Sequence, residues 1–535
     1  MRTKGIALLV FITLATVALA TVIQTLPPSP LPASAPASEF SAERAIRHIQ
    51  VIATQPRPSG SSAYEAAADY VLAELEDMGL ETETQRVGKV RNTIGWIRGD
   101  SSSDIVLLTA HLDSAHEGPG ATDDGSGVAA LLETARALMS DTPLHNTVMF
   151  LFTDAEEIGS LGAQAFINDH PMARNVRIVI GFDAGGISGP DGPSATSANN
   201  GWLIRQLAQA ENSYIVGNSA VIALAVTNAD FTNVFRGAGF SGYAFGLYWD
   251  PRIHAPEDSI ENLNPSSIQH QGYHALSLAR HFGKLDPLGD PGEPDAIFFS
   301  VLRLLVVTYP SIWAIPLAVA VTGIFCGVLA YGLKQKALTL AGIGYGAFVL
   351  LVGLIIAPLP YFLLGTWISG ITSQVADRAL KQPLQVCMLV LLALALTMIW
   401  YYLSRRIKNV SIPDLTMGAL TPMAIAMLGT SIAFSAISFT FTWPLLFSLL
   451  SSANWFYSYA HRKNSTAAIL GLLFSGATSI VIIGLPLLLG LFASAQMQIA
   501  LVFLGVLFGF LVPHFHLVMG CTIENKKQLE ESGSA

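Results

Sequence analysis

The sequence predicts an α/β domain, in which helices sandwich a sheet, followed by an all-α domain of several membrane spans. Of the 535 residues, 51% are hydrophobic and only 13% are charged, whereas a soluble domain usually has about 25% charged residues. Charged residues are also distributed unevenly along the chain. Residues 26–295 contain 33 carboxylates and only 15 Lys and Arg, whereas the remaining residues have a net charge of +9. These observations predict one acidic, water-exposed domain and one domain in lipid. The net charge of −9 argues against a nucleic-acid partner.

The N-terminus begins with an apolar run over residues 5–23, followed by a stretch rich in Pro, Ser and Ala over residues 26–38. The run is long enough to cross a bilayer, although Ala18 and Ala20 resemble the cleavage site of a secretory signal. We favour an uncleaved membrane anchor over residues 1–25. Either interpretation exports the domain that follows.

The acidic domain is expected over residues 39–290. Apolar runs at 105–109, 147–153 and 177–182 are typical of buried parallel strands. Helical spacing of apolar residues appears at 128–139 and 161–168. This alternation predicts an α/β fold, in which ligands bind at the carboxyl ends of the strands.

The second half is expected to contain an interfacial linker at 291–310, a seven-span membrane domain at 311–520 and a cytoplasmic tail at 521–535. The predicted spans are 311–333, 339–365, 384–404, 415–437, 438–458, 466–489 and 494–519. With the N-terminal anchor they make eight.

The distribution of Lys and Arg predicts the orientation. With both termini in the cytoplasm, the inside loops hold eleven basic residues, namely Arg2, Lys4, Lys334, Lys336, Arg405, Arg406, Lys408, Arg462, Lys463, Lys526 and Lys527. The outside loops of the membrane half hold only Arg378 and Lys381. The positive-inside rule therefore predicts an acidic domain in the periplasm or an organelle lumen.

Residues that can ligate a metal follow each predicted strand of the acidic domain. They are His111, Asp113, Asp123 and Asp124 after the first strand, Glu156 and Glu157 after the second, Asp183 after the third, and His254 and Asp258 in a later segment. Imidazole and carboxylate ligands together suit zinc. Taken singly, a residue of this type in such a position is more often an ordinary loop or helix-start residue. Chance is a poor explanation, however, for the clustering of all of these residues at the same edge of one sheet.

These residues form five motifs in one order: H-x-D, then D-D-G-S-G twelve residues after the histidine, E-E, an Asp after an apolar strand, and H-x-x-x-D. The pattern, over about Ser41–Phe282, resembles the M28 family of zinc aminopeptidases, whose fold has a mixed sheet. The anchor and the multispan region further resemble the membrane-bound branch that includes the endoplasmic reticulum metallopeptidases and the vacuolar membrane proteases.

The resemblance implies two Zn²⁺ ions per chain. It makes His111 and Asp183 ligands of one ion, Glu157 and His254 ligands of the other, and Asp123 the ligand that bridges them. Such a pair activates a water molecule and polarises the scissile carbonyl.

The resemblance also implies roles for residues that do not bind metal. Glu156 would be the general base, and Asp113 would orient the imidazole of His111. The peptide bond that follows the bridging aspartate is cis in the family. Many relatives place a tyrosine, which stabilises the oxyanion, where this chain has Ile253; the possible substitutes are Tyr248 and Tyr243.

We therefore expect a membrane-anchored di-zinc exopeptidase that removes N-terminal residues from peptides with a free N-terminus. One alternative is a single-zinc enzyme similar to glutaminyl cyclases. Another is a non-catalytic module of this fold on a membrane transporter or scaffold. Against ion-coupled transport, the seven C-terminal spans contain almost no carboxylate, and Asp414 lies at a span edge.

Overall fold

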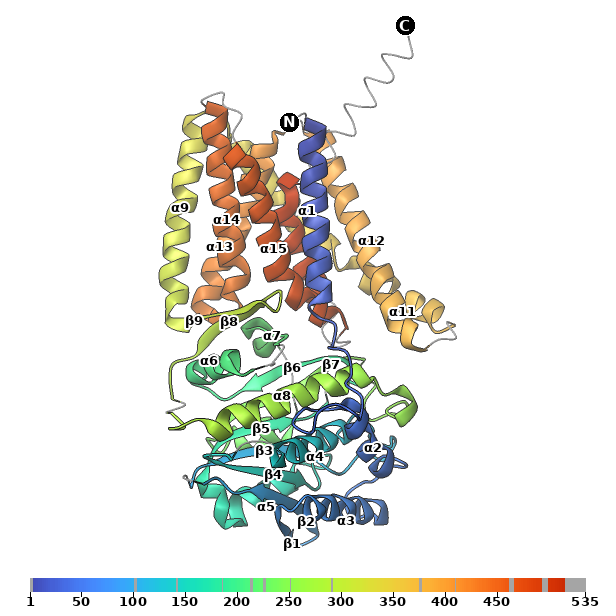
Figure 1. Cartoon of the computed structure of the whole chain (residues 1–535). Coiled ribbons are helices and arrows are strands. Elements are labelled where there is room, and N and C mark those ends of the chain that lie inside the picture. Colours follow the sequence, from blue (N-terminus) through green and yellow to red (C-terminus); the bar gives the residue numbers. More distant parts are fainter. Residues whose placement is uncertain are drawn as a thin grey trace. The chain divides into compact units, whose positions relative to one another are not determined.

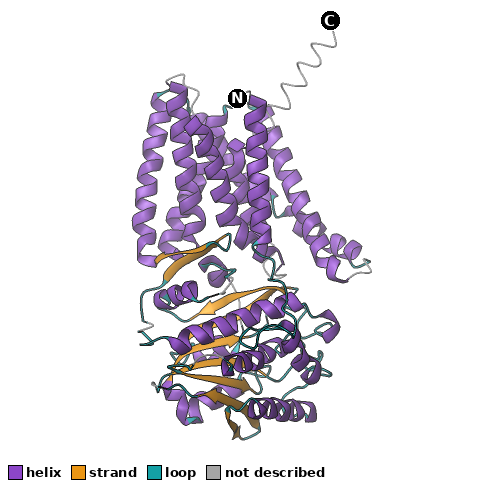
Figure 2. Ribbon diagram, viewed as in Figure 1, coloured by secondary structure: helices purple, strands orange, loops and turns teal. Residues whose placement is uncertain are grey.

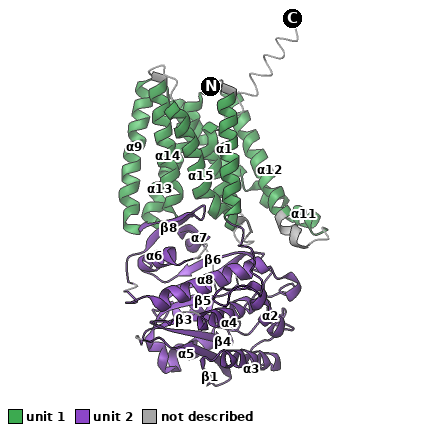
Figure 3. Cartoon of the chain, viewed as in Figure 1, with its two compact units in different colours: residues 1–24, 311–535 green, residues 25–310 purple. Residues whose placement is uncertain are grey.

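The structure is a computed structural model, and it divides the chain into two compact units (Figure 3). Residues 25–310 form the α/β unit, and residues 1–24 and 311–535 form the helical unit. The structure describes residues 3–100, 103–140, 143–184, 186–211, 215–224, 228–250, 252–289, 292–374, 378–408, 410–460, 466–492 and 499–514.

The α/β unit contains a seven-stranded mixed sheet with the strand order β1-β2-β4-β3-β5-β7-β6 (Figures 1 and 2). Strands β3, β4, β5 and β7 run parallel, and β1, β2 and β6 pair antiparallel with their neighbours. The strands are β1 (Glu81–Val87), β2 (Val90–Ile97), β3 (Ile105–His111), β4 (Thr147–Thr153), β5 (Val176–Phe182), β6 (Ser188–Thr196) and β7 (Ser241–Trp249). The predicted fold class is confirmed, and β3, β4 and β5 are the three strands that the apolar runs predicted.

Helices cover both faces of this sheet. They are α2 (Ala42–Ile52), α3 (Ser62–Asp77), α4 (Gly125–Met139), α5 (Leu161–Asp169), α6 (Gly201–Gln209), α7 (Ser219–Leu224) and α8 (Pro265–Lys284), with short helical turns at Pro171–Asn175, Phe231–Phe235 and Ile260–Asn262. Val106 and Phe150 belong to the core under α4 and α8. Leu107 and Leu151, which alternate with them, belong to the core under α5. Because both faces are buried, the central strands β3, β4 and β5 are mostly apolar.

The α/β unit begins earlier than the expected domain. The proline-rich stretch at 26–38 is held by side chains far along the chain, since the Leu31 amide donates to Gln269 Oε1 at 2.8 Å. The Arg44 guanidinium donates to the carbonyls of Ala33 and Ala35 at 2.7 and 2.9 Å. This stretch is therefore bound to the α/β unit by hydrogen bonds.

The α/β unit also ends later than expected. The segment expected to be an interfacial linker contains an antiparallel hairpin of β8 (Ala296–Val301) and β9 (Leu305–Pro310). Phe298 of β8 is buried in a small cluster with Ile204 of α6. The hairpin thus adds to the core of this unit.

We predict that residues 25–310 expressed alone fold as one cooperative unit, because they contain a continuous core of their own. Residues 39–290 should be less stable by about 3 kcal/mol or more, since Ile297 and Phe298 leave the core. That loss corresponds to a Tm lower by roughly 6–12 °C in thermal unfolding. Equal Tm values would show that both flanking segments are linkers.

The helical unit contains η4 (Ser311–Trp313) and the helices α1 (Thr3–Ile23), α9 (Ala314–Lys334), α10 (Leu340–Ile356), α11 (Leu359–Thr372), α12 (Arg378–Ile407), α13 (Ile412–Ala433), α14 (Ser435–Ala460) and α15 (Thr466–Phe492). Among the described residues, seven helical stretches are long and apolar enough to cross a membrane. The predicted span at 494–519 corresponds, in its described part, to a shorter apolar helix at Ile499–His514. The eight-span count and the topology stay predictions, and the cytoplasmic tail at 521–535 lies outside the described residues.

Two helix boundaries differ from the prediction. The span expected to end at residue 365 continues to Thr372, with a break between α10 and α11 at Pro358. A proline suits the start of a helix because it has no amide proton to donate. The second difference is the boundary between the spans predicted at 415–437 and 438–458. The structure ends α13 and begins α14 around Phe434, three residues before the predicted end of the first span. The predicted division of this uncharged block into two helices is nevertheless confirmed.

Candidate metal centre

The ends of three parallel strands bring the predicted site residues together. His111 is the last residue of β3, Glu156 and Glu157 follow β4, and Asp183 follows β5 directly. Ligand atoms of His111, Asp123 and Glu157 lie within 4.8 Å of one another. The same holds for His111, Glu156 and Asp183.

Asp123 lies between the two histidines. Its Oδ1 is 3.1 Å from His111 Nε2, and its Oδ2 is 2.9 Å from His254 Nε2. Glu157 Oε2 is 3.2 Å from His254 Nε2, and Asp183 Oδ1 is 4.0 Å from His111 Nε2. One carboxylate oxygen therefore faces each imidazole, and each imidazole has a second carboxylate beside it.

The backbone around Asp123 is fixed by two other aspartates. Asp258 accepts the amides of Thr122 and Asp123 at 2.7 and 2.9 Å. Asp124 accepts the amides of His111 and Gly127 at 3.2 and 3.0 Å, and it caps the N-terminus of α4. The Asp123–Asp124 peptide bond is cis, as the resemblance implied.

Asp113 connects the histidine to both glutamates. Its two carboxylate oxygens accept the amides of Glu156 and Glu157 at 3.0 and 3.2 Å. Its Oδ1 is 3.5 Å from His111 Nδ1, and its own carbonyl is closer to that nitrogen, at 3.1 Å. The sequence assigned Asp113 to the imidazole alone, whereas its carboxylate also positions the E-E segment.

Burial and mutual contact shift the pKa values of these groups. Burial raises the pKa of Glu156 to about 7, and burial also raises the pKa of Asp183. The hydrogen bond to Asp123 raises the pKa of His254 to about 9. Burial acts to raise the pKa of Asp123, but hydrogen bonds from both histidines lower it to about 2.

The donor set fits divalent cations. Many carboxylates meet here, namely Asp113, Asp123, Asp124, Glu156, Glu157, Asp183, Asp230 and Asp258. Burying so many carboxylates is costly unless they are paired or bind metal. The buried Oε1 of Glu157 has no hydrogen-bond partner among the described residues. The other oxygen of this carboxylate, Oε2, lies 3.2 Å from His254 Nε2, so the Glu157 carboxylate is placed to ligate a metal ion beside His254.

Sequence reasoning missed two buried residues beside the site. The guanidinium of Arg57 donates to the carbonyls of Leu112 and Gly120 at 2.6 and 3.0 Å, and it thereby holds the loop that carries Asp113. Asp230 accepts the hydroxyl of Thr153 at 2.5 Å. Neither lies in a motif, so the sequence offered no signal for them.

The side chain of Glu156 also contacts a hydroxyl group, that of Ser160. The Ser160 hydroxyl donates to Glu156 Oε1 at 3.3 Å and accepts the side-chain amide of Asn233 at 3.2 Å. These contacts limit the positions that the Glu156 carboxylate adopts.

The two tyrosines offered as oxyanion donors have other partners. Tyr243 is fully buried in the core, and its hydroxyl donates to the Leu203 carbonyl at 2.5 Å. The Tyr248 hydroxyl donates to the Pro193 carbonyl at 2.7 Å. Because both hydroxyl groups already donate their protons to backbone carbonyls, we propose neither tyrosine as the oxyanion donor.

Residues 92–279 match the family model described as Peptidase family M28. The chain carries an M28 peptidase domain. This domain contains His111, Asp123, Glu156, Glu157, Asp183 and His254 within its matched range.

Two named relatives are similar to this chain over part of its length. Endoplasmic reticulum metallopeptidase 1 of Mus musculus is 30% identical over 222 residues, which cover 40% of this chain and 25% of the mouse protein. The vacuolar membrane protease of Candida albicans is 28% identical over 280 residues, 49% of this chain and 32% of that protein. The matches therefore span about a quarter to a third of these relatives.

Solved structures similar to the M28 domain include the aminopeptidase from Aneurinibacillus sp. strain AM-1. Its TM-score is 0.40 at 15% sequence identity, and the match covers 47% of this chain and 96% of that one.

Proposed function

We propose that this protein is a membrane-anchored di-zinc exopeptidase that removes N-terminal residues from peptides outside the cytoplasm. The observation that carries the proposal is the Asp123 carboxylate, with one oxygen against each of two histidines inside an M28 domain. The names of the relatives, a metallopeptidase and a membrane protease, support the same reaction class.

The residues divide into two ligand sets. His111 and Asp183 would hold one ion, Glu157 and His254 the other, and Asp123 would bridge both. Bound zinc ions supply Lewis acidity that polarises a carbonyl and lowers the pKa of water. The unpartnered Oε1 of Glu157 and the two imidazoles support this division.

Glu156 is proposed as the general base. Its carboxylate takes a proton from the attacking water and passes it to the nitrogen of the leaving amine. Asp113 holds the Glu156 backbone and Ser160 holds its Oε1, so the carboxylate is oriented before substrate binds. The surplus of carboxylates in this unit attracts the cationic α-amine of a peptide.

The test uses residues 25–310 with metal analysis and a panel of aminoacyl and N-blocked peptide reporters. We expect two zinc ions per chain, release of free amino acids, and no cleavage of blocked reporters. One zinc ion with conversion of N-terminal glutamine to pyroglutamate would instead indicate glutaminyl-cyclase chemistry. Absence of any turnover with full metal content would indicate a non-catalytic module.

Metal affinity should depend on pH. A histidine must be neutral to bind zinc, and in the metal-free protein His254 has a pKa of about 9. Below that pH the ion must displace a proton, so affinity should rise about tenfold per pH unit for each proton displaced. Competition with a chelator from pH 6 to 9 measures this. A flat profile would remove His254 from the ligand set.

The proposed topology places both termini in the cytoplasm and the peptidase outside. A reporter active only outside the cytoplasm should work when fused near Ser101 or after Gly370, and it should fail after Lys336 or Lys463. Activity after Lys463 would contradict the eight-span arrangement.

A further inference from the structure

The tip of the β8–β9 hairpin exposes two leucines. Leu304 is 81% exposed and Leu305 is 52% exposed. The Leu304 amide donates to the Val301 carbonyl at 2.9 Å, which closes the turn. At the other end of the hairpin, Ile297 is fully buried. One end of the hairpin is therefore held in the core of the α/β unit, and the other end presents apolar side chains.

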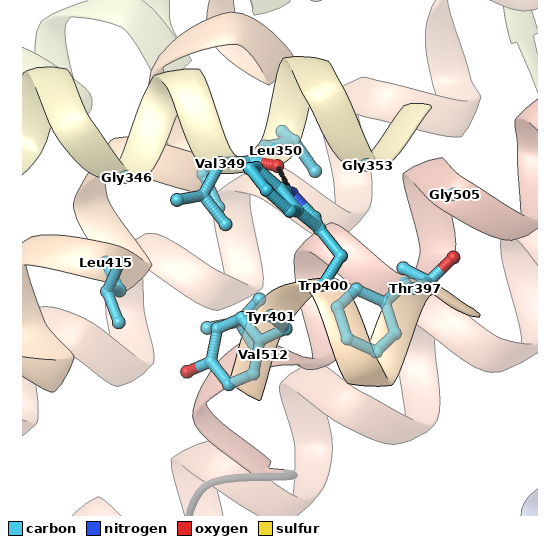
Figure 4. Close-up of a pocket in the computed structure, with 12 residues that line it drawn as sticks. Gly346, Val349, Leu350, Gly353, Thr397, Trp400, Tyr401, Leu415, Gly505 and Val512 are labelled. Atoms are coloured by element: carbon cyan, nitrogen blue, oxygen red, sulfur yellow. Dashed lines mark hydrogen bonds between the residues drawn. The ribbon is translucent and has the colours of Figure 1, made fainter. Parts of the chain in front are cut away.

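A leucine with protein neighbours is far less exposed. In the helical unit, Leu350 lines a cavity of about 20 Å³ and is only 5% exposed (Figure 4). Trp400 lines the same cavity, and its indole donates to the Val349 carbonyl at 2.8 Å. Single exposed leucines are ordinary on protein surfaces, so the exposure of the hairpin tip gains meaning only from its place in the chain.

The tip lies beside the segment that leaves α1. The Arg303 guanidinium donates to the Leu26 carbonyl, and Leu26 comes three residues after Ile23, the last residue of α1. Because each residue extends a chain by at most about 3.6 Å, Leu26 lies within about 11 Å of the end of α1. The hydrogen bond therefore keeps the hairpin tip close to that helix end.

The length of α1 relates this helix end to the bilayer. Its 21 residues measure about 31 Å, at 1.5 Å per residue, and the hydrocarbon core of a bilayer is about 30 Å thick. The headgroup layer adds about 5–8 Å on each side of that core. When α1 crosses the membrane, Leu26 and the hairpin tip are thus placed in this layer or next to it.

The other end of the hairpin is joined to a second apolar helix. Strand β9 ends at Pro310, and the apolar stretch Ser311–Lys334 begins at the next residue. The end of α1 and the start of this stretch are both joined to the α/β unit, and a folded unit stays on one side of a bilayer. Both connections therefore lie at the same membrane face, and the hairpin is tied to that face at its tip and at its base.

The composition of the two segments that meet at the tip fits a lipid surface. Residues 26–295 contain 33 carboxylates, yet residues 24–38 and 296–310 contain none, and Arg303 is their only charged residue. An arginine at a bilayer surface keeps its guanidinium among the headgroups while its stem lies along apolar groups. Tyr309 and Trp313, which follow the tip, are of the two residue types that are enriched at membrane interfaces.

We propose that the tip of the β8–β9 hairpin, Leu304 and Leu305, inserts into the headgroup layer of the bilayer that α1 and α9 cross. The partner is the lipid surface, and the contact adds to the two covalent attachments of the α/β unit. Insertion removes both exposed side chains from water, which is its driving force. The inference rests on the crossing of the bilayer by α1 and α9, and it is independent of the proposed peptidase reaction.

The first test uses the full-length wild-type protein in nanodiscs whose lipids carry a diazirine on the acyl chain close to the glycerol. We expect label at Leu304 and Leu305 and none at Val87, which is exposed at the turn between β1 and β2. Leu8 of α1 and Val319 of α9, both exposed, are the positive controls. Label at both controls with none at the tip would overturn the inference alone. Absence of label at the controls would contradict the membrane crossing and the inference with it.

The second test measures depth with a fluorescent probe on single cysteines, in a background that has serine at Cys326, Cys387 and Cys521. The probe at Leu304→Cys should be quenched by nitroxides on the lipid acyl chains and protected from iodide in the water. Its expected depth is about 5–10 Å, as for other interfacial elements. The probe at Val87→Cys should show the reverse pattern.

A substitution at the neighbouring leucine tests the driving force. With the probe at position 304, Leu305→Asp should shift the equilibrium between the inserted and the withdrawn tip about tenfold toward withdrawal, since the burial of one leucine side chain is worth at least that factor. Val51→Asp is the matched control, because Val51 is exposed on α2, and it should change nothing.

Two results of the quenching experiment would overturn the proposal. Iodide quenching at position 304 as strong as at position 87 would show that the tip stays in water. Protection from both quenchers would show that the tip is covered by protein and not by lipid. The lipid-labelling test needs no substitution, so it decides the question even if a variant fails to fold.

Discussion

Glu156→Gln is expected to lower kcat/KM by roughly 10²-fold to 10⁴-fold, the usual contribution of a general base, while two metal ions stay bound. Glutamine keeps the shape and accepts the hydrogen bond from Ser160, but it does not accept the proton. The measurement is hydrolysis of an aminoacyl reporter beside elemental analysis of the same sample.

The neighbouring Glu157→Gln is the matched control. It changes the same chemical group one residue along the chain, yet Glu157 faces His254 and is proposed as a ligand. We expect this variant to lose metal, and excess zinc should restore part of its activity. Loss of metal from Glu156→Gln, or full metal content and full activity in Glu157→Gln, would reverse the two roles.

The proposed role of Glu156 as the general base also predicts how the rate of hydrolysis depends on pH. Burial raises the pKa of Glu156 to about 7 in the metal-free protein, and bound cations lower the pKa of a nearby carboxyl. Because the base acts in its ionised form, the rate should fall as the pH falls through a value below 7. That acid limb should be absent from Glu156→Gln.

The central strands could be predicted from the sequence because helices cover both faces of the sheet there, and a strand buried on both faces has a recognisable apolar sequence. Strands β3, β4 and β5 are buried on both faces apart from the exposed Arg177 near the start of β5, so their sequences are mostly apolar. Strand β6, in contrast, reads SGPDGPSAT and contains two prolines and two glycines. It lies at the edge of the sheet, where proline is tolerated because one side of the strand has no ladder to complete. Its position, and not its composition, makes it a strand.

The candidate metal ligands could be predicted for a related reason. Strand ends and motif spacing are local features, and they place the ligands at one sheet edge. The contacts that hold these ligands are long-range, such as the Asp258 carboxylate on the amide of Asp123. The pairing of Asp113 with the glutamate amides also depends on how the β3 and β4 ends meet. Such contacts follow from the completed fold, and the sequence showed only that the residue types were available.

Asp123→Asn is expected to have the broadest effect on the site. Each carboxylate oxygen lies against one histidine, at 3.1 and 2.9 Å, and asparagine keeps only one oxygen and no charge. Both proposed ions would lose their shared anionic ligand, so we expect metal content to fall at both positions and hydrolysis to fall to the level of chelator-stripped wild type. Zinc should also stop raising the Tm, because it stabilises the folded protein only by binding to it.

Asp258→Asn separates this ligand role from support of the loop. Asp258 touches the amides of Thr122 and Asp123 and neither histidine, so its replacement loosens the bridge without removing the bridging carboxylate. We expect a 10- to 100-fold loss of metal affinity or activity, the usual cost of removing a group that orients a ligand, with recovery at higher zinc concentration. Asp123→Asn should show no such recovery. If zinc restored Asp123→Asn as well as Asp258→Asn, Asp123 would position the site and would not bridge two ions.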